Sequence, residues 1–232
     1  MLQQSRAQNS SLVISYLGLR KAIGIIGSTL PFVLALGKIL LQGPGIQSSI
    51  SNYYYTVMGD VFVGSLCATG VFLMSYRGHD RRDEIAGRLA SIFAIGVGLI
   101  PATPDVGATA RDKLIGGVHL SAAALLFLTF AYFSLVLFTM TAPDKSPTRQ
   151  KLQRNAVYRV SGYVILACIF FIALAALPPI KPLVQKFSPR FWLESVAILA
   201  FGISWLVKGE TILKDQEDEK LPFTKATAVP MH

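Results

Sequence analysis

Three ionisable residues lie near the ends of long apolar runs, where a charged group is costly. Asp60 opens one run, and His119 and Glu194 each lie about one helical turn inside another. Such a group at membrane depth costs about 2.5 to 3.5 kcal/mol, so each needs a polar partner or a function. Two carboxylates and an imidazole can bind a polar headgroup, or hold a metal ion that keeps one open water position. We therefore predict that Asp60, His119 and Glu194 converge in one polar pocket.

Aromatic and cationic residues are expected at the same level as these three. Three consecutive tyrosines precede Asp60. Two cations are expected on the same side, Lys38 near the end of the first apolar run and Arg111 just before the fourth. The tyrosines would lie over the mouth of the pocket, and a cation could meet an anionic headgroup. The predicted ligand-binding set is Asp60, His119, Glu194, Tyr53, Tyr54, Tyr55, Lys38 and Arg111.

Each of these residues also has a structural alternative. Three tyrosines at a membrane edge are typical of an interfacial aromatic belt. Asp60 could cap a helix or pair with a cation, and His119 could make a hydrogen bond between helices. Glu194 could pair with Arg190 one turn earlier in the same helix.

A membrane-embedded hydrolase, metal-dependent or not, is the alternative function for Asp60, His119 and Glu194. The chain has three histidines, and His79 and His232 lie in segments expected on the opposite side of the membrane. A serine nucleophile is not indicated either, since no nucleophile-elbow motif surrounds Ser51 or Ser121. The sequence predicts no cofactor and no metal site, and it leaves enzymatic activity open.

The composition indicates the kind of element that must position these residues. Of the 232 residues, 52% are hydrophobic and 15% are charged, and the mean hydropathy is +0.50. These values exclude a soluble globular domain. The formal net charge is +9, but the Lys and Arg residues lie between apolar runs without exposed aromatic residues among them. A nucleic-acid partner is therefore not expected.

Six apolar runs approach the 20 or so residues that a helix needs to cross about 30 Å of hydrocarbon. Continuous apolar stretches within them exclude the alternating pattern of a membrane β-barrel. The sequence thus predicts an all-α membrane protein with six transmembrane helices. The runs are Ala22 to Leu41, Met58 to Tyr76, Glu84 to Ile100, Leu114 to Met140, Tyr158 to Leu177 and Phe191 to Val207.

The distribution of basic residues orients this bundle. Six crossings place both termini on one side, and sixteen of the 22 Lys and Arg residues fall on that side. By the positive-inside rule both termini are cytoplasmic. The expected organisation is a cytoplasmic segment 1–21 without a cleaved signal peptide, a membrane domain 22–207, and a partly disordered cytoplasmic tail 208–232. Residues 12–19 could form an interfacial helix.

Small residues at four-residue spacing predict where helices approach closely. Ala86, Ala90, Ala94 and Gly98 form one such stripe, which we expect against a neighbouring helix. A second stripe of Asp60, Gly64 and Ala68 would hold Asp60 away from lipid. Cys67 and Cys168 lie inside apolar runs and predict no disulfide.

Six segments of the chain carry a resemblance to a known family: Ser49 to Tyr55, Asp60 to Gly64, Tyr76 to Gly78, Gly116 to Ala123, Phe191 to Glu194 and Trp205 to Glu210. They resemble a family of small uncharacterised bacterial inner-membrane proteins, distantly similar to the Frag1/DRAM/Sfk1 membrane proteins. The resemblance implies a six-span fold in the inner membrane and no established reaction. Ceramidases and adiponectin receptors, which use three His to hold zinc, are a poorer match because this chain lacks the second and third intramembrane His.

Together these patterns predict an integral inner-membrane protein whose polar pocket, on the extracytoplasmic side, binds a lipid or a small amphiphile. The expected partner is membrane lipid, and self-association into a homo-oligomer is left open.

Overall fold

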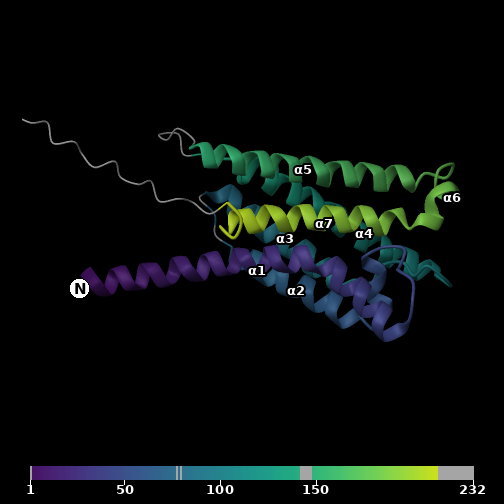
Figure 1. The fold of residues 1–232 in the computed structure, drawn as a ribbon. Helices are drawn as coiled ribbons and strands as arrows, with labels where there is room; N and C mark the ends of the chain where they lie inside the picture. Colours follow the sequence, from purple (N-terminus) through teal and green to yellow (C-terminus); the bar gives the residue numbers. More distant parts are fainter. Residues whose placement is uncertain (1, 77, 79, 142–147, 214–232) are drawn as a thin grey trace, which may run out of the picture.

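The computed structural model describes residues 2–76, 78, 80–141 and 148–213, and the regular elements in these ranges are all helices (Figure 1). Most of each predicted apolar run lies within one long helix, which confirms the helical prediction, although α1 and α5 begin well before their runs. The long helices are α1 (Leu2–Gln42), α2 (Gly59–Ser75), α3 (Arg81–Leu99), α4 (Ala110–Tyr132), α5 (Arg149–Ala175) and α7 (Pro189–Lys208). The short elements are η1 (Ser51–Tyr55), the π-helical η2 (Phe133–Leu137) that continues α4, α6 (Lys181–Val184) and η3 (Gln185–Phe187).

The six long helices form a closed ring. Each packs against its neighbours in the order α1, α2, α3, α4, α5, α7, and α7 packs back against α1. In this last contact the chains are antiparallel, because Gly24 lies beside Leu206 while Lys21 lies beside Gly209. The beginning of the first apolar run and the end of the last one therefore lie at the same end of the ring (Figure 1).

Four segments are long and apolar enough to cross a membrane: Tyr16–Gln42, Ala110–Leu137, Arg149–Ala175 and Pro189–Lys208. The other two ring helices are less apolar or shorter. Helix α2 is apolar but has 17 residues, and the first turns of α3 carry several charges.

Local sequence signals explain where several of these helices begin. The Asp80 side chain accepts hydrogen bonds from the backbone N–H groups of Arg82 and Asp83 at the start of α3. Thr109 and Asp112 form a reciprocal capping box at the start of α4. Each cap satisfies backbone donors that the first helical turn leaves without intrahelical partners.

The N-terminal segment belongs to the same helix as the first apolar run. Helix α1 continues from Leu2 to Gln42, so residues 12–19 form one uninterrupted helix with the run that follows. Residues 214–232 of the predicted cytoplasmic tail lie outside the described residues.

The stripe of small residues in α3 faces the interior of the bundle, since Ala86, Ala90 and Ala94 are buried in the core. Its last member lies against a neighbouring helix, because an added Cβ on Gly98 would lie 3.2 Å from the Leu66 side chain of α2. The prediction for the second stripe is wrong, because Asp60 and Gly64 are exposed. An added Cβ on Gly64 would meet open space. Helix α2 is rotated so that a different face, which includes Gly70, meets α3.

Glycines also allow α1 and α7 to meet. An added Cβ on Gly202 would lie 2.5 Å from the Ser28 backbone nitrogen, and one on Gly27 would lie 3.1 Å from the Gly202 Cα. The two backbones thus touch with no side chain between them, which is a strong form of packing in membrane bundles. This contact closes the ring.

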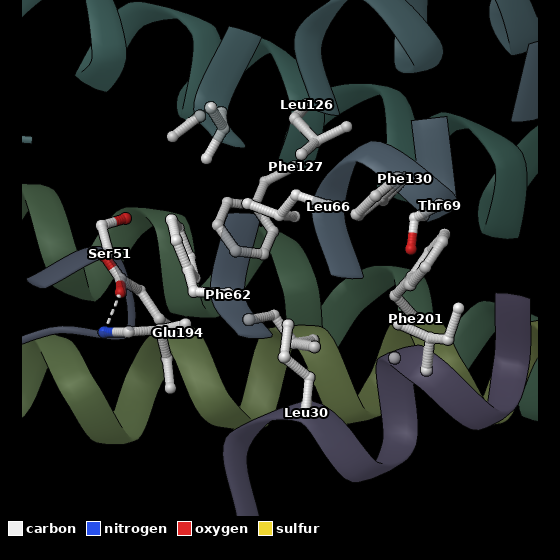
Figure 2. A pocket seen from close by; sticks show the side chains of 16 residues that line it. Leu30, Ser51, Phe62, Leu66, Thr69, Leu126, Phe127, Phe130, Glu194 and Phe201 are labelled. Atoms are coloured by element: carbon white, nitrogen blue, oxygen red, sulfur yellow. Dashed lines mark hydrogen bonds between the residues drawn. The ribbon is translucent and has the colours of Figure 1, made fainter. Parts of the chain in front are cut away.

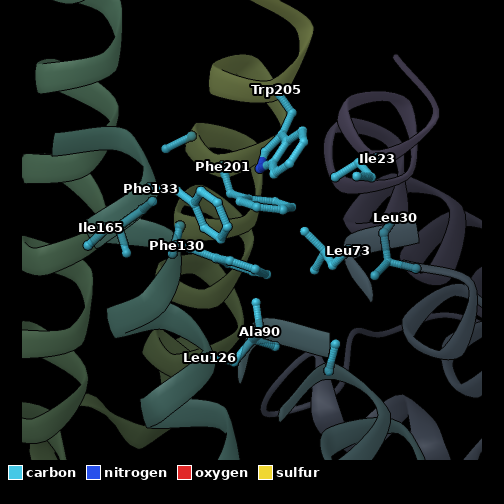
Figure 3. Close-up of a cluster of buried hydrophobic side chains, with 14 of the residues drawn as sticks. Ile23, Leu30, Leu73, Ala90, Leu126, Phe130, Phe133, Ile165, Phe201 and Trp205 are labelled. Atoms are coloured by element: carbon cyan, nitrogen blue, oxygen red, sulfur yellow. The ribbon is translucent and has the colours of Figure 1, made fainter. Parts of the chain in front are cut away.

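The middle of the ring is filled by aromatic and aliphatic side chains (Figure 3). Phe130 of α4 stacks on Phe201 of α7 in the interior of the helical ring, and the centres of their two aromatic rings are 3.5 Å apart. Trp205 is fully buried and makes edge-on contacts with Phe133. This core joins opposite helices and leaves little space between them.

Replacement of Gly202 by Ala should destabilise the protein by about 1 to 3 kcal/mol, because the new methyl group must separate α1 from α7. Gly64→Ala is the matched control, and it should cause no loss since open space surrounds that position. The thermal unfolding midpoints of the two variants in the same detergent provide the measurement. Equal midpoints would contradict the assigned helix contact.

Candidate functional site

The N-terminal turns of α7 hold the loop between α1 and α2 over one end of the ring. The Glu194 carboxylate accepts a hydrogen bond of 2.7 Å from the Ile50 backbone N–H. One turn earlier, the Phe191 backbone N–H donates to the Ser48 carbonyl at 3.1 Å. Loop 43–58 is therefore anchored to the last helix of the ring, far from it in sequence.

Glu194 also makes the local ion pair with Arg190 that was its structural alternative in the sequence analysis. Its side chain lies 3.3 Å from the Arg190 Nε, and the residue is 7% exposed. A buried carboxylate is tolerated where a cation and hydrogen-bond donors compensate its lost hydration. Arg190 and Ile50 supply both forms of compensation.

His119 lies on α4 and is 1% exposed. Its Nδ1 is 2.7 Å from the Ile100 carbonyl oxygen, at the end of α3. A carbonyl can only accept, so Nδ1 carries the hydrogen and the Nε2 of a neutral ring is an acceptor. Nε2 is buried and has no hydrogen-bond partner within the described ranges. The ring therefore presents one open acceptor inside the protein.

The direct partner of His119 is thus a backbone carbonyl at the end of α3, which matches the hydrogen bond between helices that was its structural alternative. Asp60 is exposed in the first turn of α2, where its charge interacts favourably with the helix dipole. No hydrogen bond or ion pair in the described part of the chain joins Asp60, His119 and Glu194 to one another. Arg190, however, lies within electrostatic range of both His119 and Glu194.

The two predicted cations have different environments. Lys38 is buried, and its Nζ donates to the Gly43 and Pro44 carbonyls at 3.1 and 3.0 Å. It therefore caps the end of α1, where the carbonyl groups lack helical partners. Arg111 is exposed in the first turn of α4.

The three tyrosines lie in loop 43–58, which covers this end of the ring as a cap. They have different environments and do not form one uniform aromatic belt. Tyr53 is fully buried against the Phe191 ring, and burial raises the pKa of its phenol. Tyr54 packs edge-on against Tyr55. The Tyr55 hydroxyl donates to the Ala102 carbonyl and so joins loop 43–58 to the loop after α3.

A second link between these loops is a polar network that the sequence analysis did not single out. The Ser48 hydroxyl donates to the Asp105 carboxylate, with oxygen–oxygen distances of 2.8 and 2.9 Å. The Asn52 side-chain amide in turn donates to the Ser48 oxygen at 2.8 Å. The polar, turn-rich loops suggested such contacts, but the partners are more than 50 positions apart in sequence.

A small cavity of about 50 Å³ lies beneath the cap, in the middle of the ring (Figure 2). Glu194 and Ser51 lie at one end of it, and aromatic side chains such as Phe62 and Phe127 line its walls. Typical ligand pockets measure about 300 to 1,000 Å³, so this cavity accommodates only a small group or a few water molecules. Its chemistry is a carboxylate at the end of an apolar chamber.

No group of three His, Cys, Asp or Glu residues that could hold a metal ion occurs among the described residues. The metal-dependent form of the hydrolase alternative thus lacks a ligand set there. Comparisons of the chain with family models, with functionally described proteins and with solved structures find no match. The resemblance to bacterial inner-membrane proteins accordingly stays a prediction.

Glu194→Ala should release loop 43–58, because it removes the acceptor of the Ile50 N–H. Loss of a hydrogen bond to a charged group corresponds to about tenfold faster amide exchange by local opening, or more. Hydrogen exchange of residues 48–55 measures this effect. Glu194→Gln keeps an acceptor and should be milder, while Asp60→Ala, at an exposed position, should leave the loop protected. An unchanged loop in Glu194→Ala would refute the anchoring role.

Proposed function

We propose that the protein crosses the membrane six times, through α1, α2, α3, α4, α5 and α7. Four of these helices are each long and apolar enough to cross a membrane. The observation that supports the other two is their outward face: Val71 and Met74 of α2, and Ile92 and Leu99 of α3, are each between 56% and 59% exposed. Outward apolar side chains next to long spans are suited to lipid. At 1.5 Å per residue, 17 residues of α2 reach about 26 Å.

The proposed orientation places both termini in the cytoplasm and the Glu194 end of the ring outside it. The sixteen basic residues on the terminal side support this orientation. The location that we propose is the bacterial inner membrane, on the basis of the family resemblance alone.

The proposed activity is binding of a lipid or small amphiphile at the extracytoplasmic end. Glu194 and Ser51 would meet its polar group, and the apolar cavity walls would take part of its hydrocarbon. Since the Glu194 carboxylate at the end of the cavity is an acceptor, it favours a polar group with hydrogen-bond donors, such as a hydroxyl or an amine. A ligand larger than the cavity requires loop 43–58 to move, and the hydrogen bond from Ile50 to Glu194 is the contact that must break.

Reporter fusions test the topology. Fusions after Gly43, Val106 and Phe187 should report the extracytoplasmic side, because each position follows an odd number of crossings in the six-span arrangement. An alkaline phosphatase and a fluorescent protein fused at each position give opposite readouts. A cytoplasmic signal from two of the three fusions would refute the six-span topology.

A pair of adjacent alanines tests the ligand site. Ala123 lines the cavity and Ala124 does not. Ala123→Leu should fill the cavity and abolish a co-purifying amphiphile in native mass spectrometry, because the added side chain occupies the ligand volume. Ala124→Leu should retain that amphiphile. Wild-type protein that carries no amphiphile after mild extraction, or equal retention by both variants, would refute binding in this cavity.

A further inference from the structure

A group of cations faces inward at the opposite end of the ring. Arg20 comes from α1, Lys151 and Arg154 from α5, and Lys208 from the end of α7. Basic residues at a membrane edge ordinarily extend towards water and headgroups, as exposed Arg159 does. Arg154 is instead 9% exposed, although it lies on the same helix.

Aromatic rings lie beside Arg20 and Lys208 and make cation–aromatic contacts with them. The Arg20 guanidinium lies 5.5 Å from the Tyr16 ring centre and 5.6 Å from that of Tyr76. The Lys208 ammonium lies 5.2 Å from the Phe138 ring centre. The same Phe138 contributes its carbonyl oxygen to the Lys151 ammonium, at 2.8 Å. Aromatic faces attract cations and leave their hydrogen-bond donors available.

The π-helical turn at the end of α4 positions Phe138, one of these aromatic residues. In η2 the Phe138 N–H bonds to the Phe133 carbonyl, five residues earlier, at 2.8 Å. The side chains of Phe133 and Phe138, at the two ends of this widened turn, both contact Trp205. Figure 3 shows Phe133 and Trp205 among the buried side chains. Such π-helical turns occur frequently at functional sites.

Positive charge predominates in this group. Lys208 interacts electrostatically with Arg20, Lys151 and Arg154, and with one carboxylate, that of Asp83. Among the described groups that act on Lys208, cations therefore outnumber carboxylates. Holding like charges together in a partly desolvated place costs free energy that an anion would recover.

Two of the cations also have donors available. The Arg20 Nε is buried without a hydrogen-bond partner in the described part of the chain. The Lys208 ammonium makes a cation–aromatic contact, and none of the hydrogen bonds found among the described residues involves it. A guanidinium and an ammonium that converge from different helices match the several acceptor oxygens of a phosphate group.

We propose that Arg20, Lys151, Arg154 and Lys208 form a binding site for a phosphate group at the cytoplasmic end of the ring. Its position at the membrane edge suits the phosphate of an anionic phospholipid in the cytoplasmic leaflet, and free phosphate shares the same chemistry. This site lies at the other end of the ring from Glu194 and does not depend on the amphiphile proposed there.

The test measures the thermal unfolding midpoint of the full chain in detergent at constant ionic strength. The probes are phosphatidylglycerol, phosphatidylcholine and inorganic phosphate. The wild type should be stabilised by phosphatidylglycerol and not by phosphatidylcholine if the ligand is a lipid, and by inorganic phosphate as well if a free anion suffices. No stabilisation by either anionic probe would overturn the proposal.

Variants separate this site from general surface attraction. Lys208→Gln should weaken the response to the anionic probe about tenfold in apparent affinity. Without the probe its unfolding midpoint should not fall below that of the wild type, because one like charge has been removed. Arg159→Gln removes one exposed charge from α5 and should respond as the wild type does. An equal loss of response in both variants would overturn the proposal.

Two further variants keep the test decisive. Arg20→Lys retains the charge and removes the Nε donor, so an intermediate response is expected even if Lys208→Gln does not fold. The other variant neutralises the acidic residues of the C-terminal tail, Asp215, Glu217, Asp218 and Glu219. If the wild type ignores the probes and this variant responds, the tail itself occupies the cations and the phosphate proposal is wrong.

Discussion

The close backbone contact between α1 and α7 is the constraint on which the rest of the structure depends. Gly27 and Gly202 let the first and last long helices touch, and this contact closes the ring of six. Because α7 is thereby fixed beside α1, Glu194 lies under the loop that follows α1, and it accepts the Ile50 N–H. At the opposite end the same contact brings Lys208 towards Arg20.

Polar groups serve the two ends of the ring differently. At the Glu194 end, buried polar side chains bond mainly to loop backbone, as His119 does with Ile100 and Lys38 does with Gly43. Backbone groups removed from water must find such partners inside the protein. At the other end, cations rest on aromatic rings, with a single carboxylate, Asp83, among the groups that act on Lys208. One end is thus closed by hydrogen bonds, and the other carries excess charge.

Sequence patterns were sufficient for the six long helices but not for every helix start, since α1 and α5 begin before the apolar runs. The apolar runs predicted six helices because burying about 20 residues in lipid demands a continuous apolar segment. The caps Asp80 and Thr109 were not predicted, although they act within three residues and local sequence could have indicated them. The pairing of Glu194 with Arg190 was likewise predictable, since residues four apart share a helix face.

What the sequence could not determine was the rotation of each helix and the identity of distant partners. Asp60 and Gly64 share a face that small-residue spacing favoured for packing, yet α2 turns that face outward. The spacing of small residues states that a face can pack, and only the neighbouring helices decide which face does. The partner of His119 is a backbone carbonyl. Every residue has such a group, so the sequence does not indicate which carbonyl will be the partner. The sequence by itself therefore determined the helices and the positions of polar residues along them. Ring closure decided which groups meet, because contacts between distant segments depend on how all six helices pack together.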